Sequence, residues 1–380
     1  MRTVTARYPT AENLEPARTE QSALTALRES VAELRLRMRA ALAQPERSED
    51  FSYGRSPVVR VFDPAIRPGK SLSAERDVGR RQEEILKLLR DKGPFRLIGA
   101  LACTTLAERL SALNQSHPNF RAATDFLLQE EALARHQGTG IGGVRLLLHG
   151  APGVGKTDFA LRVAEILGLP SEIIGMSSAQ ASASLGGSET YWSNTKPGQV
   201  FEAIVVGKTD EPPVANPLFV LDELEKSGRD GGDALGALFQ LLEEASARVF
   251  TDKSVPWLPI DASYVNWIAT ANDVSTVHPA ILSRFTLIDP SALTCEQRRA
   301  IAQRLYSGML DEFKLRGRLD EELNDEAMEQ LTRGSVRDTK RILRQSIASA
   351  LLTGEHRVRV RVHDQDIPKK RTRIGFLSEK

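Results

Sequence analysis

The stretch Val144-Arg-Leu-Leu-Leu-His-Gly-Ala-Pro-Gly-Val-Gly-Lys-Thr157 decides the fold of this chain. Its apolar run Leu146–Leu148 predicts a buried strand, which leads directly into Gly150–Thr157, a match to the phosphate-loop pattern G-x-x-x-x-G-K-[ST]. An amphipathic helix is expected at Asp158–Leu167, closed by Gly168. Strand, glycine-rich loop and helix therefore follow one another in the order that a phosphate-binding loop requires.

Each part of this loop has a chemical role toward a nucleotide. The glycines let the backbone turn several N–H groups toward a phosphate chain, and the helix N-terminus adds its positive dipole end. Lys156 supplies a positive charge for the β- and γ-phosphates, and the hydroxyl of Thr157 supplies a ligand for Mg²⁺. The sequence therefore predicts ATP and Mg²⁺ as the cofactors.

Composition places the chain among ordinary water-soluble proteins. It has 380 residues, of which 41% are hydrophobic and 27% charged, with a net charge of +1. This length predicts about two or three domains, and the charge balance gives no global sign of a nucleic-acid or membrane partner. Cys103 and Cys295 form no metal-binding pattern, and neither a membrane-spanning run nor a signal-peptide core is present in the sequence. We expect a cytoplasmic protein.

The sequence divides into five predicted regions: a partly disordered arm (1–50), a mainly helical module (51–115), an α/β nucleotide-binding domain (116–289), a helical lid (290–353) and a basic tail (354–380). In the arm, residues 21–44 have one apolar helical stripe, which is typical either of a coiled coil between subunits or of a helix packed on its own domain. The proline-containing residues 45–73, with a β-like run at Val58–Phe62, are expected to form an extended linker or a small irregular module.

Apolar strands alternate with helices from 144 to 288, which indicates a parallel sheet covered by helices on both faces. The expected strands are 146–148, 171–176, 217–223, 264–271 and 286–288. Beyond them, amphipathic segments at 296–315, 320–331 and 336–352 predict a small helical bundle. In the tail, Arg and Val alternate over His356–Val362, the period of a half-exposed strand, before the basic run Pro368–Arg373.

Polar side chains at the ends of two of these strands complete a hydrolytic site. Asp222 ends a buried strand, where it can hold Mg²⁺ directly or through water, and Glu223 can orient and deprotonate the attacking water. Asn272 ends the next strand, where it either fixes that water, contacts the γ-phosphate or serves as a turn residue. Arg284 and Arg337 can bring guanidinium groups to phosphate, one from a neighbouring subunit and one from the same chain, or can be surface arginines. The residues expected to bind ATP are Gly150, Ala151, Pro152, Gly153, Val154, Gly155, Lys156, Thr157 and Asp222.

Together these motifs resemble those of AAA+ ATPases, and within that superfamily the ATPase module of Lon proteases. The narrower resemblance lies in four runs: Asp222-Glu-Leu-Glu-Lys226 after the metal-binding acid, Thr190–Gln199 with its aromatic residues before Pro-Gly, Val255–Asp261, and Pro279–Arg284. The resemblance extends over about residues 117–350. It implies a P-loop NTPase fold of the AAA+ type, with a helical lid at its C-terminal end and a mainly helical module at its N-terminal end.

The resemblance also implies roles. Glu223 would activate water, Asn272 would be the first sensor, Arg284 the arginine finger acting on the next subunit's ATP, and Arg337 the second sensor on the lid. Tyr191 and Trp192 would form the substrate pore loop, where aromatic side chains grip a polypeptide. Because family members work as hexameric rings, a homo-oligomer is expected.

The chain also departs from the Lon pattern. It ends roughly where a Lon proteolytic domain would begin, so we expect that it is not a protease by itself. In the pore loop, Ser193 or Asn194 stands where the family has a glycine after the aromatic residue.

The sequence favours a Mg-dependent ATPase that couples hydrolysis to protein remodelling or unfolding in a ring, as a chaperone does. One alternative is an ATPase linked to nucleic acid, with the basic tail as its contact. Another is an ATP-driven regulatory scaffold for a separately encoded protease or effector.

Overall fold

The computed structural model describes residues 57–68, 76–178, 181–188, 195–208, 212–227 and 234–360. Three features predicted from the sequence lie outside these residues: the helix at 21–44, the aromatic pair Tyr191-Trp192 and the basic run Pro368–Arg373.

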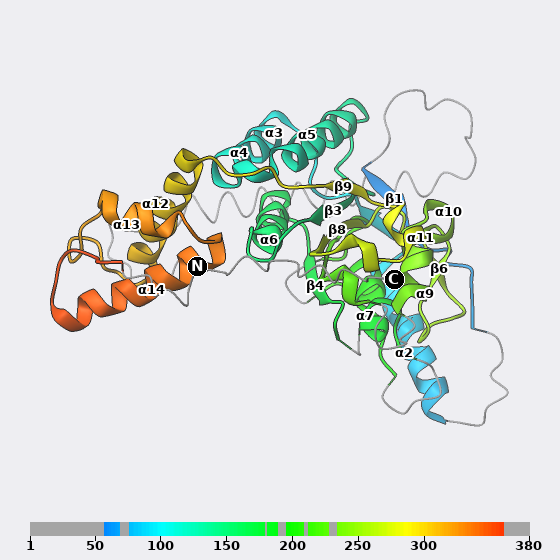
Figure 1. The fold of residues 1–380 in the computed structure, drawn as a ribbon. Helices are drawn as coiled ribbons and strands as arrows, with labels where there is room; N and C mark the ends of the chain where they lie inside the picture. Colours follow the sequence, from blue (N-terminus) through cyan, green and yellow to red (C-terminus); the bar gives the residue numbers. More distant parts are fainter. Residues whose placement is uncertain are drawn as a thin grey trace, which may run out of the picture. The chain divides into compact units, whose positions relative to one another are not determined.

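A five-stranded parallel sheet forms the centre of the fold (Figure 1). The strands lie in the order β4-β5-β8-β3-β9, and their bounds are Ser171–Gly175 (β4), Leu218–Asp222 (β5), Asn266–Ala271 (β8), Arg145–His149 (β3) and Thr286–Ile288 (β9). Each falls within two residues of the strand predicted for it. The strand that leads into the glycine loop thus lies between β8 and β9, close to the strands that carry Asp222 and Asn272.

The sheet is buried on both faces because its apolar side chains alternate between two hydrophobic clusters. Leu147, Phe219 and Trp267 belong to one cluster, whereas their chain neighbours Leu146, Leu148, Leu218, Val220 and Ile268 belong to the other. Phe219 and Trp267 are paired in register on adjacent strands, and their rings stack with centroids 5.2 Å apart.

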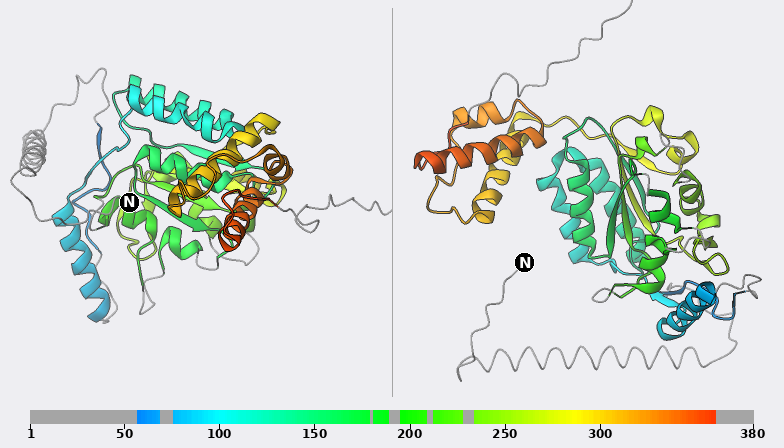
Figure 2. Two further views of the ribbon diagram at one scale, coloured as in Figure 1. Left: turned by 90° about the vertical axis from the view of Figure 1, so that its left-hand side faces the viewer. Right: turned by 90° about the horizontal axis from the view of Figure 1, so that it is seen from below.

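Different helices cover the two faces, as Figure 2 shows for the sheet seen edge-on. Helices α3 (Thr104–Ser111), α4 (Leu113–Ser116), η2 (Pro118–Phe120), α5 (Arg121–His136) and α6 (Lys156–Leu167) pack against the face of Leu146. The other face is covered by α7 (Ala181–Gly186), α8 (Gln199–Phe201), the π-helical η3 (Glu202–Val206), η4 (Leu224–Lys226), α9 (Ala234–Leu241), α11 (Pro279–Leu282) and the hairpin β6 (Phe250–Thr251) with β7 (Pro259–Ile260). The short α10 (Glu244–Ala247) packs against α9. The short η5 (Val274–Thr276) follows β8.

The described residues between 57 and 113 contribute side chains to the same hydrophobic clusters. Strand β1 (Val58–Arg60) pairs antiparallel with β2 (Phe95–Leu97), and α2 (Arg76–Lys92) lies between them in sequence. Arg96 is buried and donates hydrogen bonds to the carbonyl oxygens of Ile204 (2.6 Å), Val205 (3.0 Å) and Gly93 (2.8 Å). Burial lowers the pKa of Arg96 to about 10. Its side chain therefore joins this N-terminal region to η3 on the sheet domain.

Three helices after the sheet form a bundle with its own hydrophobic cluster: α12 (Cys295–Glu312), α13 (Asp325–Leu331) and α14 (Val336–Thr353). Capping boxes start α12 at Thr294 and α14 at Ser335, which satisfy backbone N–H groups in the first turn of each helix. Helix α13 begins five residues later than the sequence pattern predicts, because the side chain of Asn324 caps it by accepting a hydrogen bond from Ala327. Each of the three segments predicted for the lid thus contains a helix, the second of them shorter than predicted.

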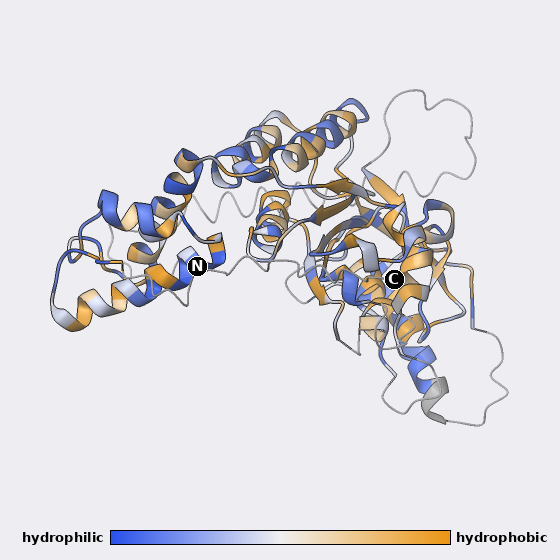
Figure 3. Cartoon of the chain, in the orientation of Figure 1, coloured by the Kyte–Doolittle hydropathy of each residue, from blue (hydrophilic) through white to orange (hydrophobic). Residues whose placement is uncertain are grey.

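Hydrophobic residues gather in the sheet and on the inner sides of the helices (Figure 3). In the described part of the chain, none of the helices has the length and hydropathy needed to cross a membrane. The predicted fold class is confirmed: a parallel sheet between two helical layers, with further helical regions before and after it.

Candidate nucleotide-binding site

The glycine loop has a backbone that other residues would strain. Gly153 and Gly155 have φ angles of 81° and 98°, in the left-handed region that favours glycine, and Gly155 directly precedes α6. A Cβ atom at Gly153 would also lie 2.9 Å from the Oγ of Ser335. The loop thus turns at the N-terminus of a twelve-residue helix, where backbone N–H groups and the helix dipole favour an anion.

Lys156, the first residue of α6, is buried and turned into the loop. Its Nζ donates to the carbonyl oxygens of Gly150 (2.7 Å) and Ala151 (3.1 Å) and to the Oδ1 of Asn272 (2.9 Å). Burial lowers the pKa of Lys156, and the negative charges of Glu225 and Asp222 oppose that shift. The ammonium group is therefore held at the end of β3 by acceptors that a phosphate can replace.

Asp222 accepts two hydroxyl hydrogen bonds through the same carboxylate oxygen. Thr157 Oγ1 donates to its Oδ1 at 2.8 Å, and Thr270 Oγ1 donates at 2.7 Å. These residues come from the start of α6, the end of β5 and the neighbouring strand β8. The structure thus brings together the two oxygen ligands that the sequence predicted for Mg²⁺.

Glu223 follows Asp222 in a left-handed conformation, with φ 59° and ψ 53°. A non-glycine residue with this backbone is uncommon, and such residues cluster at functional sites. Its N–H donates to Thr270 Oγ1 (3.1 Å), and its carboxylate accepts a hydrogen bond from Lys226 Nζ at 2.6 Å. The backbone of the predicted base is thus held by Thr270 of β8, and its carboxylate is paired with Lys226 of η4.

Asn272 lies between Lys156 and a buried acid that sequence analysis did not single out, Glu225. Its Nδ2 donates to Glu225 Oε1 at 2.7 Å, and its backbone N–H donates to the same oxygen at 3.2 Å. Glu225 is part of the run Asp222–Lys226, which we had noted only for its resemblance to Lon proteases. The spatial contact depends on the 3₁₀ turn of η4, which no residue pattern specified.

The lid reaches the loop through the start of α14. The backbone N–H of Arg337 points at the carbonyl oxygen of Gly153, with the two atoms 3.4 Å apart. The positive charge of Arg337 also contributes to the lowered pKa of Lys156. The predicted second sensor is therefore placed at the glycine loop of its own chain.

Arg284 lies at the other end of the sheet. It precedes β9, which runs parallel to β3 with Thr286 opposite Leu146, so it is near the start of β3, whereas the loop follows the end of β3. Its Nε pairs with Glu243 Oε2 at 3.2 Å, its Nη1 donates to the carbonyl of Ala280, and its guanidinium lies 5.8 Å from the ring centre of Phe239. The structure does not bring Arg284 to the loop of its own chain.

No group of three or more His, Cys, Asp or Glu side chains suited to a metal is present among the described residues. Mg²⁺ needs no such cage in nucleotide sites, because it is bound there by one or two protein oxygens, phosphates and water. Thr157 and Asp222, whose oxygens lie 2.8 Å apart, fit that requirement.

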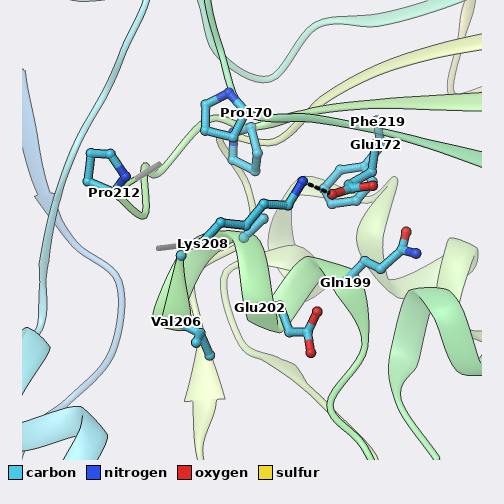
Figure 4. Close-up of a pocket in the computed structure, with 11 residues that line it drawn as sticks. Pro170, Glu172, Gln199, Glu202, Val206, Lys208, Pro212 and Phe219 are labelled. Atoms are coloured by element: carbon cyan, nitrogen blue, oxygen red, sulfur yellow. Dashed lines mark ion pairs between the residues drawn. The ribbon is translucent and has the colours of Figure 1, made fainter. Parts of the chain in front are cut away.

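A separate cavity of about 190 Å³ lies at the amino end of β4 and β5, away from the loop (Figure 4). Pro170, Pro217 and Phe219 contribute to its lining, and Lys208 pairs with Glu172 at 2.5 Å in its wall. Burial is the main cause that raises the pKa of Glu202, another lining residue. None of the predicted nucleotide ligands lines this cavity.

Comparison with known proteins finds sequence similarity over the central part of the chain. The family described as "ATPase family associated with various cellular activities (AAA)" matches residues 146–289. The mitochondrial Lon protease homolog of Emericella nidulans is 28% identical over 235 residues, which are 62% of this chain and 21% of the relative. The Lon protease of Dictyoglomus thermophilum is 30% identical over 268 residues, 68% of this chain and 33% of the relative. The chain thus spans about a fifth to a third of the length of these relatives.

Among solved structures, a closed state of Hsp104 with ATPγS and casein has a TM-score of 0.54 at 17% identity, covering 66% of this chain and 48% of that one. An extended Hsp104–casein complex from S. cerevisiae has a TM-score of 0.52 at 18% identity, covering 66% of this chain and 48% of that one. At these identities the likeness concerns the fold alone. Residues 146–289 therefore match the AAA family, and the central part of the chain is similar in sequence to Lon proteases, consistent with a Lon-like ATPase module.

Proposed function

We propose that this chain binds ATP with Mg²⁺, hydrolyses it, and uses the cycle to remodel or unfold a protein as a ring of identical subunits in the cytoplasm. The observation that carries the proposal is the convergence of Lys156, Thr157, Asp222 and Asn272 on the N-terminus of α6. Glu223 follows the metal-binding acid directly, in a strained backbone conformation.

Lys156 is the group that would hold the β- and γ-phosphates. Its hydrogens now go to two loop carbonyls and to Asn272, and hydrogen bonds between an ammonium and a phosphate are stronger than those to neutral carbonyls. ATP would therefore draw the ammonium away from the carbonyls of Gly150 and Ala151. The negative charge of the phosphate would also stabilise the charged form of Lys156, which burial disfavours.

Thr157 and Asp222 would hold Mg²⁺, which when bound neutralises charge on the phosphate oxygens. The Oδ1 of Asp222 is kept in place by Thr270, which lies on the adjacent strand and does not belong to the glycine loop. Thr270 also accepts a hydrogen bond from the Glu223 N–H, so one hydroxyl fixes both the metal-binding carboxylate and the backbone of the predicted base.

Glu223 would accept a proton from the attacking water. In this structure its carboxylate is paired with Lys226 at 2.6 Å, with both side chains 37% exposed. An ion pair with this exposure is weak, so the carboxylate can leave Lys226 at little cost when water and nucleotide are in place.

Arg284 and Arg337 would complete the site from two directions. Arg337 belongs to α14, whose start contacts Gly153, so it would sense the nucleotide of its own chain and couple it to the lid. Arg284 lies beyond the opposite end of the sheet, so it would reach phosphate only in a neighbouring subunit. This position supports a ring, and we propose a hexamer because Lon-type ATPases form one.

Protein remodelling is proposed from the similarity to Lon proteases, with Tyr191 and Trp192 as the side chains that would grip the polypeptide. Sequence-tolerant packing by aromatic rings suits a pore that must accept many side chains in turn. Because the chain spans a third or less of the Lon proteases cited, proteolysis is not part of the proposal.

The variant Glu223→Gln tests this function. It keeps the phosphate and metal ligands but removes the proton acceptor, so ATP binding should persist while turnover falls by about 100-fold or more. Binding is measured with a fluorescent ATP analogue and turnover by phosphate release. Glu165→Gln, which changes an exposed acid on α6, is the matched control and should hydrolyse ATP normally. Undiminished turnover by Glu223→Gln would refute the assignment.

A further inference from the structure

Glu225 is a buried acid in the middle of η4, next to the site but outside the set of predicted ligands. Glu225 is 8% exposed. One carboxylate oxygen, Oε1, accepts hydrogen bonds from both the backbone N–H and the side-chain Nδ2 of Asn272. The other oxygen, Oε2, is buried and has no hydrogen-bond partner among the described residues.

The neighbours of Asn272 decide which way its amide faces. The ammonium of Lys156 can only donate hydrogen bonds, so the amide atom beside it must be the oxygen. An ionised carboxylate can only accept, so the amide atom beside Glu225 must be the nitrogen. A reversed amide would set N–H groups against the ammonium and an oxygen against the carboxylate. The orientation is therefore fixed by chemistry on both sides.

When Lys156 turns to a phosphate, only Glu225 continues to hold this orientation. The buried carboxylate also lies near enough to Lys156 to be the leading negative charge opposing its lowered pKa. The other acids in the site have different partners, since Asp222 accepts from Thr157 and Thr270, and Glu223 from Lys226.

We propose that Glu225 is a positioning residue for ATP hydrolysis, which keeps the amide nitrogen of Asn272 engaged so that its oxygen faces the nucleotide. Asn272 then accepts a hydrogen from the attacking water, and does not donate one to the γ-phosphate. This inference rests on the proposed function and decides between the two catalytic roles that the sequence left open for Asn272, fixing the water or contacting the γ-phosphate.

The test is a double-mutant cycle of Glu225→Ala and Asn272→Ala, with kcat and KM for ATP measured by phosphate release. If Glu225 acts through Asn272, Glu225→Ala lowers kcat by about 10- to 100-fold, as removal of an outer-shell partner does, while KM changes little. The double variant should then be no slower than Asn272→Ala alone.

Two further variants separate positioning from folding. Glu225→Gln keeps an acceptor oxygen for both N–H groups of Asn272 and places its NH₂ where Oε2 has no partner, so it should recover most of the lost kcat. Glu131→Ala is the matched control, because Glu131 on α5 is also buried, at 1% exposed, and one of its carboxylate oxygens likewise has no hydrogen-bond partner within the described ranges. It should lower the melting temperature and leave kcat of the folded protein unchanged.

Multiplicative losses in the double variant, or an unchanged kcat in Glu225→Ala, would overturn the inference while the ATPase assignment stood. A Glu225→Gln variant as slow as Glu225→Ala would also overturn it, because a maintained acceptor would then be irrelevant. If the unaltered chain releases no phosphate from ATP, the proposed function fails, and this inference fails with it.

Discussion

The two ends of the central sheet hold buried polar side chains of similar chemistry that do different things. At the carboxyl end, Lys156 donates to carbonyls of its own loop and to Asn272. At the amino end, Asn216 and Asn266 are fully buried, and their amides bond to backbone groups of the segment after β2 and of the segments before β3 and β5. At the carboxyl end, a ligand can replace the acceptors of Lys156. At the amino end, the two buried asparagines are already bonded to backbone groups and are closed off from other partners.

The difference gives a way to read buried polar residues in a parallel sheet. Asn266 accepts from the Val144 N–H and donates to the carbonyls of Ile141 and Asn216. Its side chain therefore links the start of β8 to the segments before β3 and β5. At the carboxyl end, by contrast, Lys156 carries a buried positive charge, and Glu225 has a carboxylate oxygen that finds no partner in the described part of the chain. Buried polar atoms without a hydrogen-bond partner among the described residues also occur at Arg145, at the start of β3, and at Glu131. What points to a ligand at the carboxyl end is therefore that such an atom lies together with the buried Lys156 and the other predicted ligands.

The strongest test of this contrast is Lys156→Met, which keeps an aliphatic chain of similar length but removes the ammonium. Turnover should fall by about 100-fold or more, because a preorganised charge on the transferred phosphoryl group is lost. Thermal stability should stay equal or rise, since a buried charge is replaced by an apolar group. Steady-state phosphate release and a thermal melt measure the two effects, with exposed Lys87→Met as the control. A clear drop in melting temperature would contradict the contrast.

At the other end, Asn266→Ala should show the opposite pattern. It leaves the Val144 N–H and the Asn216 carbonyl buried without their partners, whereas the Ile141 carbonyl still accepts from Asn216, so the free energy of unfolding should fall by about 3 kcal/mol. The kcat of the molecules that remain folded should stay close to that of the unaltered chain. Urea unfolding and turnover normalised to folded protein give the two numbers. A selective loss of kcat without loss of stability would show that the amino end takes part in hydrolysis.

The pH dependence of stability gives a smaller effect. Burial lowers the pKa of Lys156 below its ordinary value of 10.5, so the folded chain releases this proton at a lower pH than the unfolded chain. Between those two pKa values the unfolded state binds more protons, and stability therefore gains with rising pH from this group. The advantage of Lys156→Met over the unaltered chain should be full at neutral pH and narrow under alkaline conditions. Urea unfolding of both proteins across that range measures it, and a widening difference would contradict the sign.

The smallest expected effect concerns the lid. Ser335→Ala removes the N-cap of α14, which should lower stability by about 1 kcal/mol. Because the start of α14 contacts Gly153, KM for ATP should also rise modestly. Thr294→Ala, which removes the equivalent cap from α12, is the matched control and should reduce stability without raising KM. If the two variants changed KM equally, the cap at Ser335 would have no specific part in nucleotide binding, and the prediction would be wrong.

Sequence patterns predicted the features that depend on neighbours in the chain. The strand before Gly150, the strand ending at Asp222 and the three lid helices follow from apolar periodicity and the glycine pattern, and the structure contains each of them. The alternation of Arg and Val after 356 also predicted burial correctly, with Val358 and Val360 buried, although no strand is formed through residue 360. Side chains alternate between two sides in any extended segment, so the alternation of Arg and Val predicts which side is buried but not whether the segment pairs with another strand.

Contacts between distant segments could not be predicted in this way. The β-like run predicted at Val58–Phe62 contains strand β1, but its pairing with β2 and the burial of Val61 and Phe62 in the core of the sheet do not follow from the run itself. The contact of Glu225 with Asn272 likewise depends on a turn that reverses the chain after Asp222. Local composition does not determine which long-range partner such a segment meets.

The central claim is that a hydrolytic site at the carboxyl end of one sheet is completed by Arg284 from another subunit. Mixing Lys156→Met with Arg284→Ala tests it directly, because the first variant keeps the arginine and the second keeps the nucleotide site. Each variant alone should be inactive, and co-assembled subunits should regain about a quarter of the unaltered turnover, as random mixing in a cyclic ring predicts. A mixture that co-assembles but shows no more turnover than the two variants separately would contradict the claim.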